Sequence, residues 1–364
     1  MARAAVFCCP ESESLYHERL TKVPDAQEKY VQDTHISLAH GNGGRLMREL
    51  IEEIFARHLG GGHLDVHVDA ATIEMPFGRQ LITTDGFTVQ PLEFPGGDIG
   101  TLAVHGTCND LAVSGATPCF LTLNAFVEEG LEVALLDRLV ASIARAAAET
   151  GVAVVAGDTK VLRRGEGGGL YLATTGVGVA SSDLDLSIAN IRAGDRILVS
   201  GPVGDHGIAV MLAREEFGMR GDLQSDAASV LPLTQAAGRV PGLRFMRDPT
   251  RGGLATVMHE LMHVTGLQVR LQQMDVPVHD AVVSVCEMLG YDPLYLACEG
   301  RVVAIVAADA ADQLLSVWRT TPGGQGAACV GELIEGRERV VLVTELGGER
   351  ILEELEDDPL PRIC

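Results

Sequence analysis

The chain has 364 residues, of which 46% are hydrophobic, and its formal net charge at pH 7 is −22. This length predicts two domains with sizeable cores, and the negative charge argues against general nucleic-acid binding, which needs a basic face. No apolar run reaches the roughly 18 residues of a membrane span, and residues 1–10 make a poor signal peptide. We therefore expect a cytoplasmic protein without membrane association.

The cysteine and lysine content restricts the kinds of site that the chain can hold. The eight cysteines are scattered and form no Cys-x-x-Cys pair, which argues against a zinc finger, a thioredoxin-type centre or a disulfide framework. Lys160 is the only lysine after residue 29, in a chain that otherwise uses arginine. Lysine has a tunable pKa, so Lys160 is a candidate for a role that arginine cannot fill, with chance retention as the alternative.

The first half of the chain predicts an α+β domain over residues 35–188, after an extension over residues 1–34 whose role is open. Gly43 and Gly44 precede a helix with an apolar stripe from Leu46 to Leu59. Such a glycine turn can bind phosphate through backbone N–H groups, or it is a flexible linker. Strands are predicted at 63–68, 81–84, 120–127, 152–155 and 171–179, and a helix at 131–149.

The second half predicts another domain over residues 189–345. Its expected strands are 196–200, 267–271, 301–307, 329–334 and 339–343, and its expected helices are 205–217, 225–238, one from 253, 278–289 and 310–319. Residues 346–364 are predicted to be a mobile tail that ends in Cys364. Pro359 and Pro361 disfavour helix there, so Cys364 lies either on a semi-rigid arm or at a frayed terminus.

Four aspartates are predicted in tight turns, most of them beside glycine or at the end of an apolar run: Asp85, Asp110, Asp158 and Asp248. Carboxylates at strand ends are suited to holding Mg²⁺ together with phosphate oxygens and water. Aspartate is also a common turn and N-cap residue, and this ordinary preference is enough to explain the presence of any single one of the four. Four of them beside the isolated Lys160 favour a magnesium–nucleotide site.

Several motifs resemble the HypE family of hydrogenase maturation proteins, in the aminoimidazole-ribonucleotide-synthetase-like (PurM-like) superfamily of ATP-binding proteins. The resemblance covers about residues 35–364, and its most specific part is the terminal Pro-Arg-Ile-Cys. The other matching motifs are Gly-Gly-Asp-Ile-Gly at 96–100, Asn-Asp-Leu-Ala-Val-Ser-Gly-Ala at 109–116, Gly-Asp-Thr-Lys-Val at 157–161, Gly-Asp-His-Gly at 204–207 and Arg-Asp-Pro-Thr-Arg-Gly-Gly at 247–253.

The resemblance implies a PurM-like two-domain α+β fold, in which the N-terminal domains of a homodimer build a shared β-barrel-like core with ATP bound beside it. The C-terminal domain is then α/β, and the tail is flexible. The resemblance also implies that a carbamoyltransferase, HypF, places a carbamoyl group on Cys364, and that the group is dehydrated to a thiocyanate with ATP. The cyano group then passes to iron on a HypC–HypD scaffold, for [NiFe]-hydrogenase.

The resemblance also assigns residues. It implies Cys364 as the carrier of the substrate, Glu299 as a base and Lys160 as an electrostatic or proton-handling partner. It implies Mg²⁺ ligands at Asp85, Asp110 and Asp158, which would neutralise charge during phosphoryl transfer. The residues matched to ATP binding are Asp85, Asn109, Asp110, Gly157, Asp158, Thr159, Asp248, Arg251, Gly43 and Gly44.

Two alternatives stay open at this point. One is another PurM-like enzyme, such as a selenophosphate synthetase or a thiamine-phosphate kinase, neither of which needs a terminal cysteine. The loop Gly41-Asn42-Gly43-Gly44-Arg45 lacks the cysteine and lysine that a selenophosphate synthetase would use. The other alternative is a non-catalytic, nucleotide-gated scaffold that presents the thiol to a partner enzyme. Gly86 also departs from the serine that is common in relatives of the family.

Overall fold

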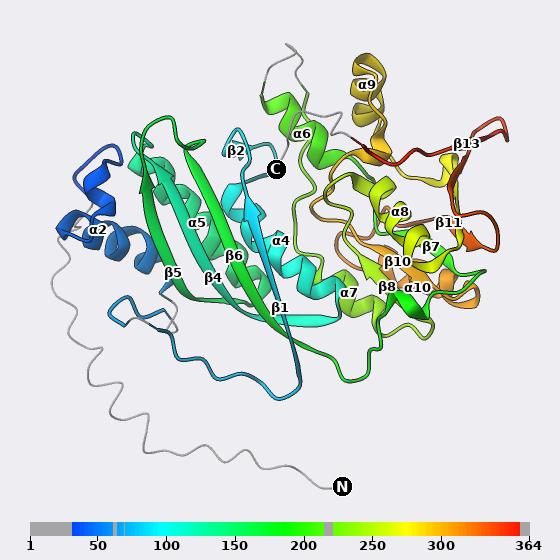
Figure 1. The fold of residues 1–364 in the computed structure, drawn as a ribbon, viewed down its shortest axis with the longest axis horizontal. Helices are drawn as coiled ribbons and strands as arrows, with labels where there is room; N and C mark the ends of the chain where they lie inside the picture. Colours follow the sequence, from blue (N-terminus) through cyan, green and yellow to red (C-terminus); the bar gives the residue numbers. More distant parts are fainter. Residues whose placement is uncertain (1–30, 61–63, 69, 215–220, 357–364) are drawn as a thin grey trace, which may run out of the picture.

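The structure, a computed structural model, describes residues 31–60, 64–68, 70–214 and 221–356. These residues form two halves side by side, each built on its own β-sheet (Figure 1). A four-stranded sheet lies in the first half and a seven-stranded sheet in the second. In the described part of the chain, no helix combines the length and apolar character that a membrane crossing requires.

The first half begins with helical segments and continues into the four-stranded sheet. After η1 (Leu38–Gly41), one continuous helical run is made of α2 (Arg45–Leu50), η2 (Ile51–Ala56) and α3 (Arg57–Leu59). The sheet has the order β1 (Arg79–Phe87), β6 (Leu170–Ala180), β4 (Ala116–Glu128) and β5 (Ala153–Leu162). Strands β4 and β5 are parallel and are joined through α5 (Val133–Thr150), whereas the other pairs are antiparallel. A short ribbon of β2 (Glu93–Phe94) and β3 (Gly97–Asp98) precedes α4 (Ile99–Val113).

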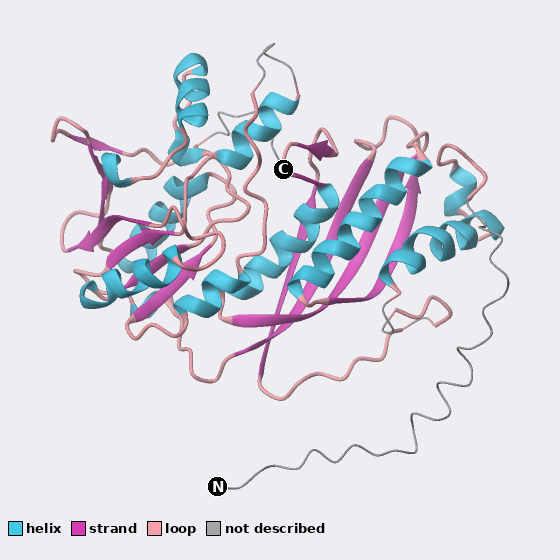
Figure 2. Ribbon diagram, turned by 180° about the vertical axis from the view of Figure 1, so that it is seen from behind, coloured by secondary structure: helices cyan, strands magenta, loops and turns pink. Residues whose placement is uncertain are grey.

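Helices α4 and α5 cover only one face of the four-stranded sheet (Figure 2). Burial alternates along β6 and β4, so every second residue packs against these helices. Residues paired across neighbouring strands share a face, which defines the opposite, open face. The open face carries Ile82 and Thr84 of β1, Thr175 and Val177 of β6, Thr122, Asn124 and Phe126 of β4, and Asp158 and Lys160 of β5.

The seven-stranded sheet of the second half has helices on both sides. Its order is β13 (Glu349–Ile351), β12 (Val340–Val343), β9 (Gln268–Gln272), β11 (Ala328–Ile334), β7 (Arg196–Val199), β10 (Val303–Val306) and β8 (Leu243–Arg247). One hydrophobic core lies around α8 (Gly253–Thr265), and another around α7 (Leu231–Ala237) and α10 (Ala311–Arg319). The remaining elements are α6 (Asp205–Ala213), α9 (Asp280–Leu289), η3 (Ile188–Asn190), η4 (Gln273–Asp275), η5 (Pro293–Tyr295) and η6 (Ala308–Ala310).

The structure corrects several predicted elements. Residues 64–68 form no strand, and the helix predicted from 225 begins at Leu231. Strand β8 and the fifteen-residue helix α4 were not predicted from the sequence. Helix α4 is started by Asp98, whose side chain accepts hydrogen bonds from the N–H groups of Gly100 and Thr101.

Three of the four predicted acidic turns are wrong. Asp85 lies within β1 and Asp158 within β5, and Asp110 lies in α4. Only Asp248 lies in a loop, directly after β8. Strands β1 and β5 are the two edges of their sheet, where polar and glycine-rich sequences are tolerated because one side of the strand needs no partner.

The predicted tail starts with ordered structure. Strand β13 pairs with β12, and Leu352 is fully buried and donates its N–H to the carbonyl of Val340. Residues 357–364, and with them Pro359, Pro361 and Cys364, lie outside the described part of the chain, as do residues 1–30.

Candidate functional site

A cavity of about 340 Å³ lies between the two halves of the molecule. It brings together five of the predicted site residues: Asp85, Asp110, Asp248, Arg251 and Glu299. Asp85 comes from β1 and Asp110 from α4, Asp248 and Arg251 come from the loop between β8 and α8, and Glu299 comes from the loop before β10. We call this cavity the carboxylate cleft.

Two of its aspartates face each other across the sheet–helix boundary. Asp85 pairs with the buried Thr174 in the strand register, so its side chain lies on the helix-covered face. Asp110 of α4 accepts a 3.0 Å hydrogen bond from the hydroxyl of Thr83 on the same face. Arg251 reaches in from the second half, with its Nη2 atom 3.6 Å from Oδ1 of Asp85.

Burial and mutual repulsion set the charge of the cleft. Burial raises the pKa of Asp110, and the neighbouring Asp85 carboxylate adds to the rise, which the hydrogen bond from Thr83 partly offsets. Asp248 is 7% exposed, and burial together with the Asp110 carboxylate raises its pKa to about 7. Carboxylates that raise one another's pKa are stabilised by a cation, so this donor set suits a hard divalent ion.

Glu299 lines the same cleft and is 7% exposed. Its backbone is fixed on both sides: its N–H donates to the Asp226 carboxylate at 3.1 Å, and its carbonyl accepts from the Asn109 amide at 3.1 Å. The Asn109 side chain also donates to the carbonyl of Ala228 at 3.0 Å and accepts from the N–H of Val230 at 2.9 Å. Asn109 therefore joins α4 to the second half and holds the loop that carries Glu299.

The other predicted residues gather on β5 and the glycine loop before α2. Lys160 Nζ lies 3.6 Å from Oδ2 of Asp158, and both side chains are exposed on the open face. Gly157, Asp158 and Thr159 line a separate cavity of about 90 Å³. The glycine loop, which includes Gly43 and Gly44, is beside this strand, because Gly41 packs directly against Val161. We call Asp158, Lys160 and this loop the β5 cluster.

Within one chain, the β5 cluster is remote from the carboxylate cleft. Strands β1 and β5 are opposite edges of the sheet, separated by three strand spacings or about 14 Å. Asp85 and Lys160 also lie on opposite faces of the sheet. The sequence motifs therefore fold into two groups of residues.

Sequence reasoning missed several residues that line the cleft: Thr84, Arg247, Thr256 and Glu260. Arg247 and Glu260 form an ion pair at 3.4 Å. Thr256 and Glu260 are four residues apart on α8 and so share a helix face, a spacing that could have been found in the sequence. Their partners across the cleft come from β1 and α4, which the sequence does not place near α8.

The fold and the cleft define a class of protein. Residues 67–180 match the family model described as AIR synthase related protein, N-terminal domain, and residues 192–343 match the corresponding C-terminal domain. The two models together cover most of the chain, which is therefore an AIR synthase-related protein with the PurM-like α+β fold.

Comparison with individual proteins is more specific. The carbamoyl dehydratase HypE of Azotobacter vinelandii is 46% identical over 331 residues, which is 90% of this chain and 97% of that protein. A crystal structure of the hydrogenase maturation protein HypE in complex with ATP is 41% identical, with a TM-score of 0.85 over 90% of this chain and 99% of its own. HypE in a HypE–HypF complex is also 41% identical, with a TM-score of 0.73 over 84% and 99%. The chain belongs to the HypE family of carbamoyl dehydratases in hydrogenase maturation.

Proposed function

We propose that this chain dehydrates a carbamoyl group carried on the sulfur of its own Cys364 to a thiocyanate, with ATP as the co-substrate, and so supplies the cyanide ligand for the iron of a [NiFe]-hydrogenase. Membership of the carbamoyl dehydratase family supports this proposal. The observation that carries it is the carboxylate cleft, which gathers Asp85, Asp110 and Asp248 beside the buried Glu299. A nucleotide-gated thiol carrier would also use the aspartates to bind a nucleotide, but it would lack the water loss that the experiment below measures.

The cleft is suited to a magnesium–ATP complex. Asp85, Asp110 and Asp248 offer the carboxylate oxygens that Mg²⁺ prefers, and Arg251 places a guanidinium beside them. Transfer of the terminal phosphoryl group of ATP to the amide oxygen makes that oxygen a leaving group, and loss of two protons from the nitrogen completes the thiocyanate. A solved relative is described as a complex with ATP, which supports the nucleotide assignment.

Glu299 is the proposed base for the amide protons. It is the carboxylate whose loop is fixed by Asp226 and Asn109, so it meets the substrate in a held position. In this proposal the cation engages Asp85, Asp110 and Asp248, and Glu299 takes the proton-transfer role.

Lys160 and Asp158 are proposed to come from a second copy of the chain. In the described part of the chain, α4 and α5 cover only the other face of this sheet, and Ile82 on the open face is 73% exposed. Such a sheet is suited to packing against another sheet. If a two-fold axis runs along the strands, the β1 edge of one copy lies beside the β5 edge of the other. The homodimer would then join one carboxylate cleft to one β5 cluster, and Lys160 would act as the electrostatic partner of Glu299.

Two further assemblies are proposed. A solved HypE–HypF complex supports a HypF-type carbamoyltransferase as the partner that loads Cys364. A HypC–HypD iron scaffold, which family membership suggests, is proposed as the acceptor of the cyano group. Cleavage of the S–C bond returns the Cys364 thiolate, and the acceptor side supplies the two electrons that make the cyano group a cyanide ligand.

Mass spectrometry tests this function. The whole chain, carbamoylated at Cys364, is incubated with Mg²⁺ and ATP, and the C-terminal peptide is expected to lose the mass of one water molecule. Glu299→Gln should slow this loss by about 10²–10⁴-fold, the usual effect of removing a general base. A carbamoylated peptide that keeps its mass would contradict the dehydratase proposal, and an unchanged rate in Glu299→Gln would contradict its assignment as base.

A further inference from the structure

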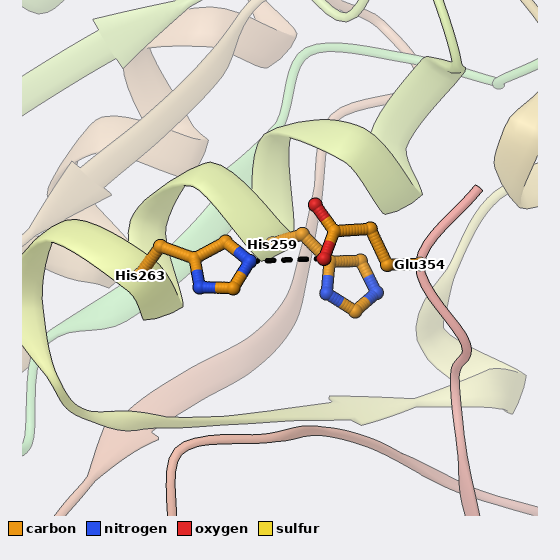
Figure 3. A group of neighbouring side chains, drawn as sticks. All are labelled: His259, His263 and Glu354. Carbon is orange, nitrogen blue, oxygen red and sulfur yellow. Dashed lines mark hydrogen bonds and ion pairs between the residues drawn. The ribbon is translucent and has the colours of Figure 1, made fainter. Parts of the chain in front are cut away.

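Helix α8 and the start of the C-terminal segment carry a group of side chains outside the carboxylate cleft. His259 and His263 lie four residues apart on α8, and Glu354 comes from the segment that follows β13 (Figure 3). One ligand atom from each of the three residues lies within 4.8 Å of the other two. We infer that these residues form a binding site for a divalent transition-metal ion of the Zn²⁺ type, which clamps the C-terminal segment to α8.

The spacing of the two histidines is the first argument. Residues i and i+4 lie on one face of a helix, so both imidazoles can reach a single ion. The sequence His259-Glu260-Leu261-Met262-His263 has the His-Glu-x-x-His pattern with which helices hold zinc. A carboxylate from a later segment is a common third ligand beside two histidines.

Glu260 lies between these histidines in the sequence but belongs to another site. Its carboxylate pairs with Arg247 at 3.4 Å and lines the carboxylate cleft. In a zinc peptidase this glutamate acts as a base beside the metal, whereas the Glu260 carboxylate is held in the carboxylate cleft by Arg247. The inference is accordingly a metal clamp without hydrolytic activity.

The buried imidazole of His259 is the second, independent argument. This residue is 6% exposed, and within the described part of the chain neither of its ring nitrogens has a hydrogen-bond partner. Buried polar atoms are nearly always satisfied, so an imidazole in this state points to a missing ligand. Figure 3 shows its ring beside the Glu354 carboxylate, with His263 on the other side.

The distances between the three side chains need only a small adjustment to hold one metal ion. His263 Nε2 and Glu354 Oε2 are 3.0 Å apart. Two ligand atoms at bonds of 2.0–2.1 Å to a tetrahedral ion lie about 3.3 Å apart, so this pair already has the required separation. His263 and Glu354 are both about half exposed, so their side chains can turn toward His259, and the fourth position is open to water.

The position of Glu354 means that the clamp limits how far the C-terminal residues can extend from α8. The chain before it is already fixed, since Leu352 is buried and the carbonyl of Glu353 accepts a hydrogen bond from the Tyr295 hydroxyl. Glu354 lies ten residues before Cys364. Ten extended residues span at most about 33–36 Å, so the clamp sets the distance from α8 that the terminal sulfur can reach. Metal binding itself does not depend on the proposed dehydratase function.

Calorimetry on chelator-treated whole chain tests the site. Zn²⁺ is expected to bind at one site per chain, and His263→Ala and Glu354→Gln should each weaken binding about 10–100-fold or more. Both residues are exposed, so the test does not depend on whether His259→Ala folds. His58→Ala is the matched control, because His58 also bonds a carboxylate, that of Asp137 at 2.8 Å, and should bind Zn²⁺ like the wild type.

Two further readouts separate this site from thiol binding and test the clamp. Co²⁺ should give a tetrahedral d–d spectrum without a thiolate charge-transfer band. At ten times the Kd, Zn²⁺ should slow tryptic cleavage after Arg350 by about tenfold in the wild type and not in Glu354→Gln. Wild-type Zn²⁺ affinity in both His263→Ala and Glu354→Gln would overturn the inference, and so would a thiolate band or no Zn²⁺ binding by the wild type.

Discussion

Ionisation of Asp248 in the carboxylate cleft is unfavourable. Its carboxyl group follows β8, is 7% exposed and has a pKa of about 7 instead of its usual 3.8, mainly because of burial and secondly because of Asp110. A buried carboxylate in this position costs stability when it is ionised, and a bound cation would remove that cost.

The first prediction concerns the pH dependence that follows from Asp248. Because its pKa is raised in the folded state, the stability it contributes is present below pH 3.8 and is lost as pH rises toward and through 7. Without Mg²⁺, Asp248→Asn should therefore raise the free energy of unfolding at pH 8 by about 1–4 kcal/mol relative to its effect at pH 4. Urea unfolding at both pH values measures this, and an identical pH dependence in the variant and the wild type would contradict it.

The sequence pointed to the individual residues of the cleft but not to their setting. Asp85, Asp110, Asp248 and Arg251 were recognised from motifs, and the structure places all four in one cavity. Their placement in turns was wrong for Asp85 and Asp110, since glycine or a polar neighbour also occurs in an edge strand or near a helix end. Which side chain faces the cleft depends on strand register, and no motif encodes that register.

Helix α4 is the element that connects the two halves. Of its fifteen residues, thirteen are buried, including small and polar ones such as Gly106 and Asn109. A helix buried on all sides has no apolar stripe with a period of 3.6 residues, which is the physical reason why sequence reasoning missed it. Amphipathic α5, which covers the same sheet, was predicted nearly to its ends.

The second prediction concerns Asn109 on α4. Asn109→Ala removes three buried or part-buried hydrogen bonds between α4 and the second half, so it should lower the free energy of unfolding by about 2–4 kcal/mol. It should also lower kcat, because the loop of Glu299 loses a support. Asn190→Ala is the control: its amide bonds the exposed Asp185, and its effect should stay within about 0.5 kcal/mol. Equal unfolding free energies of the two variants would contradict this role.

At the scale of the whole molecule, the open face of the first sheet predicts a dimer. Ile82 is 73% exposed at its edge. Ile82→Arg would bury an unpaired charge in the proposed interface, at a cost of about 3–5 kcal/mol per copy, and should turn the dimer into a monomer. Light scattering after gel filtration gives the mass. Met288→Arg, which changes a side chain 65% exposed on α9, should stay dimeric, and a dimeric Ile82→Arg variant would contradict the use of this face.

The division of the predicted site into two groups is also a property of the whole molecule. The motif around Asp158 and Lys160 and the motif around Asp248 are equally visible in the sequence, yet β5 and β1 are opposite edges of one sheet. The sequence shows which residues are candidates for the site. How far apart they lie is set by the sheet topology, and in the proposed dimer a second copy of the chain brings the two groups together.

In the proposed homodimer, one carboxylate cleft and the β5 cluster of the other copy make one dehydratase site. A heterodimer of Lys160→Ala and Asp110→Asn chains, isolated with two different affinity tags, tests it through the water loss of carbamoylated Cys364. Each homodimer should be inactive. The heterodimer keeps one complete site if Lys160 is supplied by the other copy, so it should show about half of the wild-type rate. A heterodimer as inactive as the two homodimers would contradict the account.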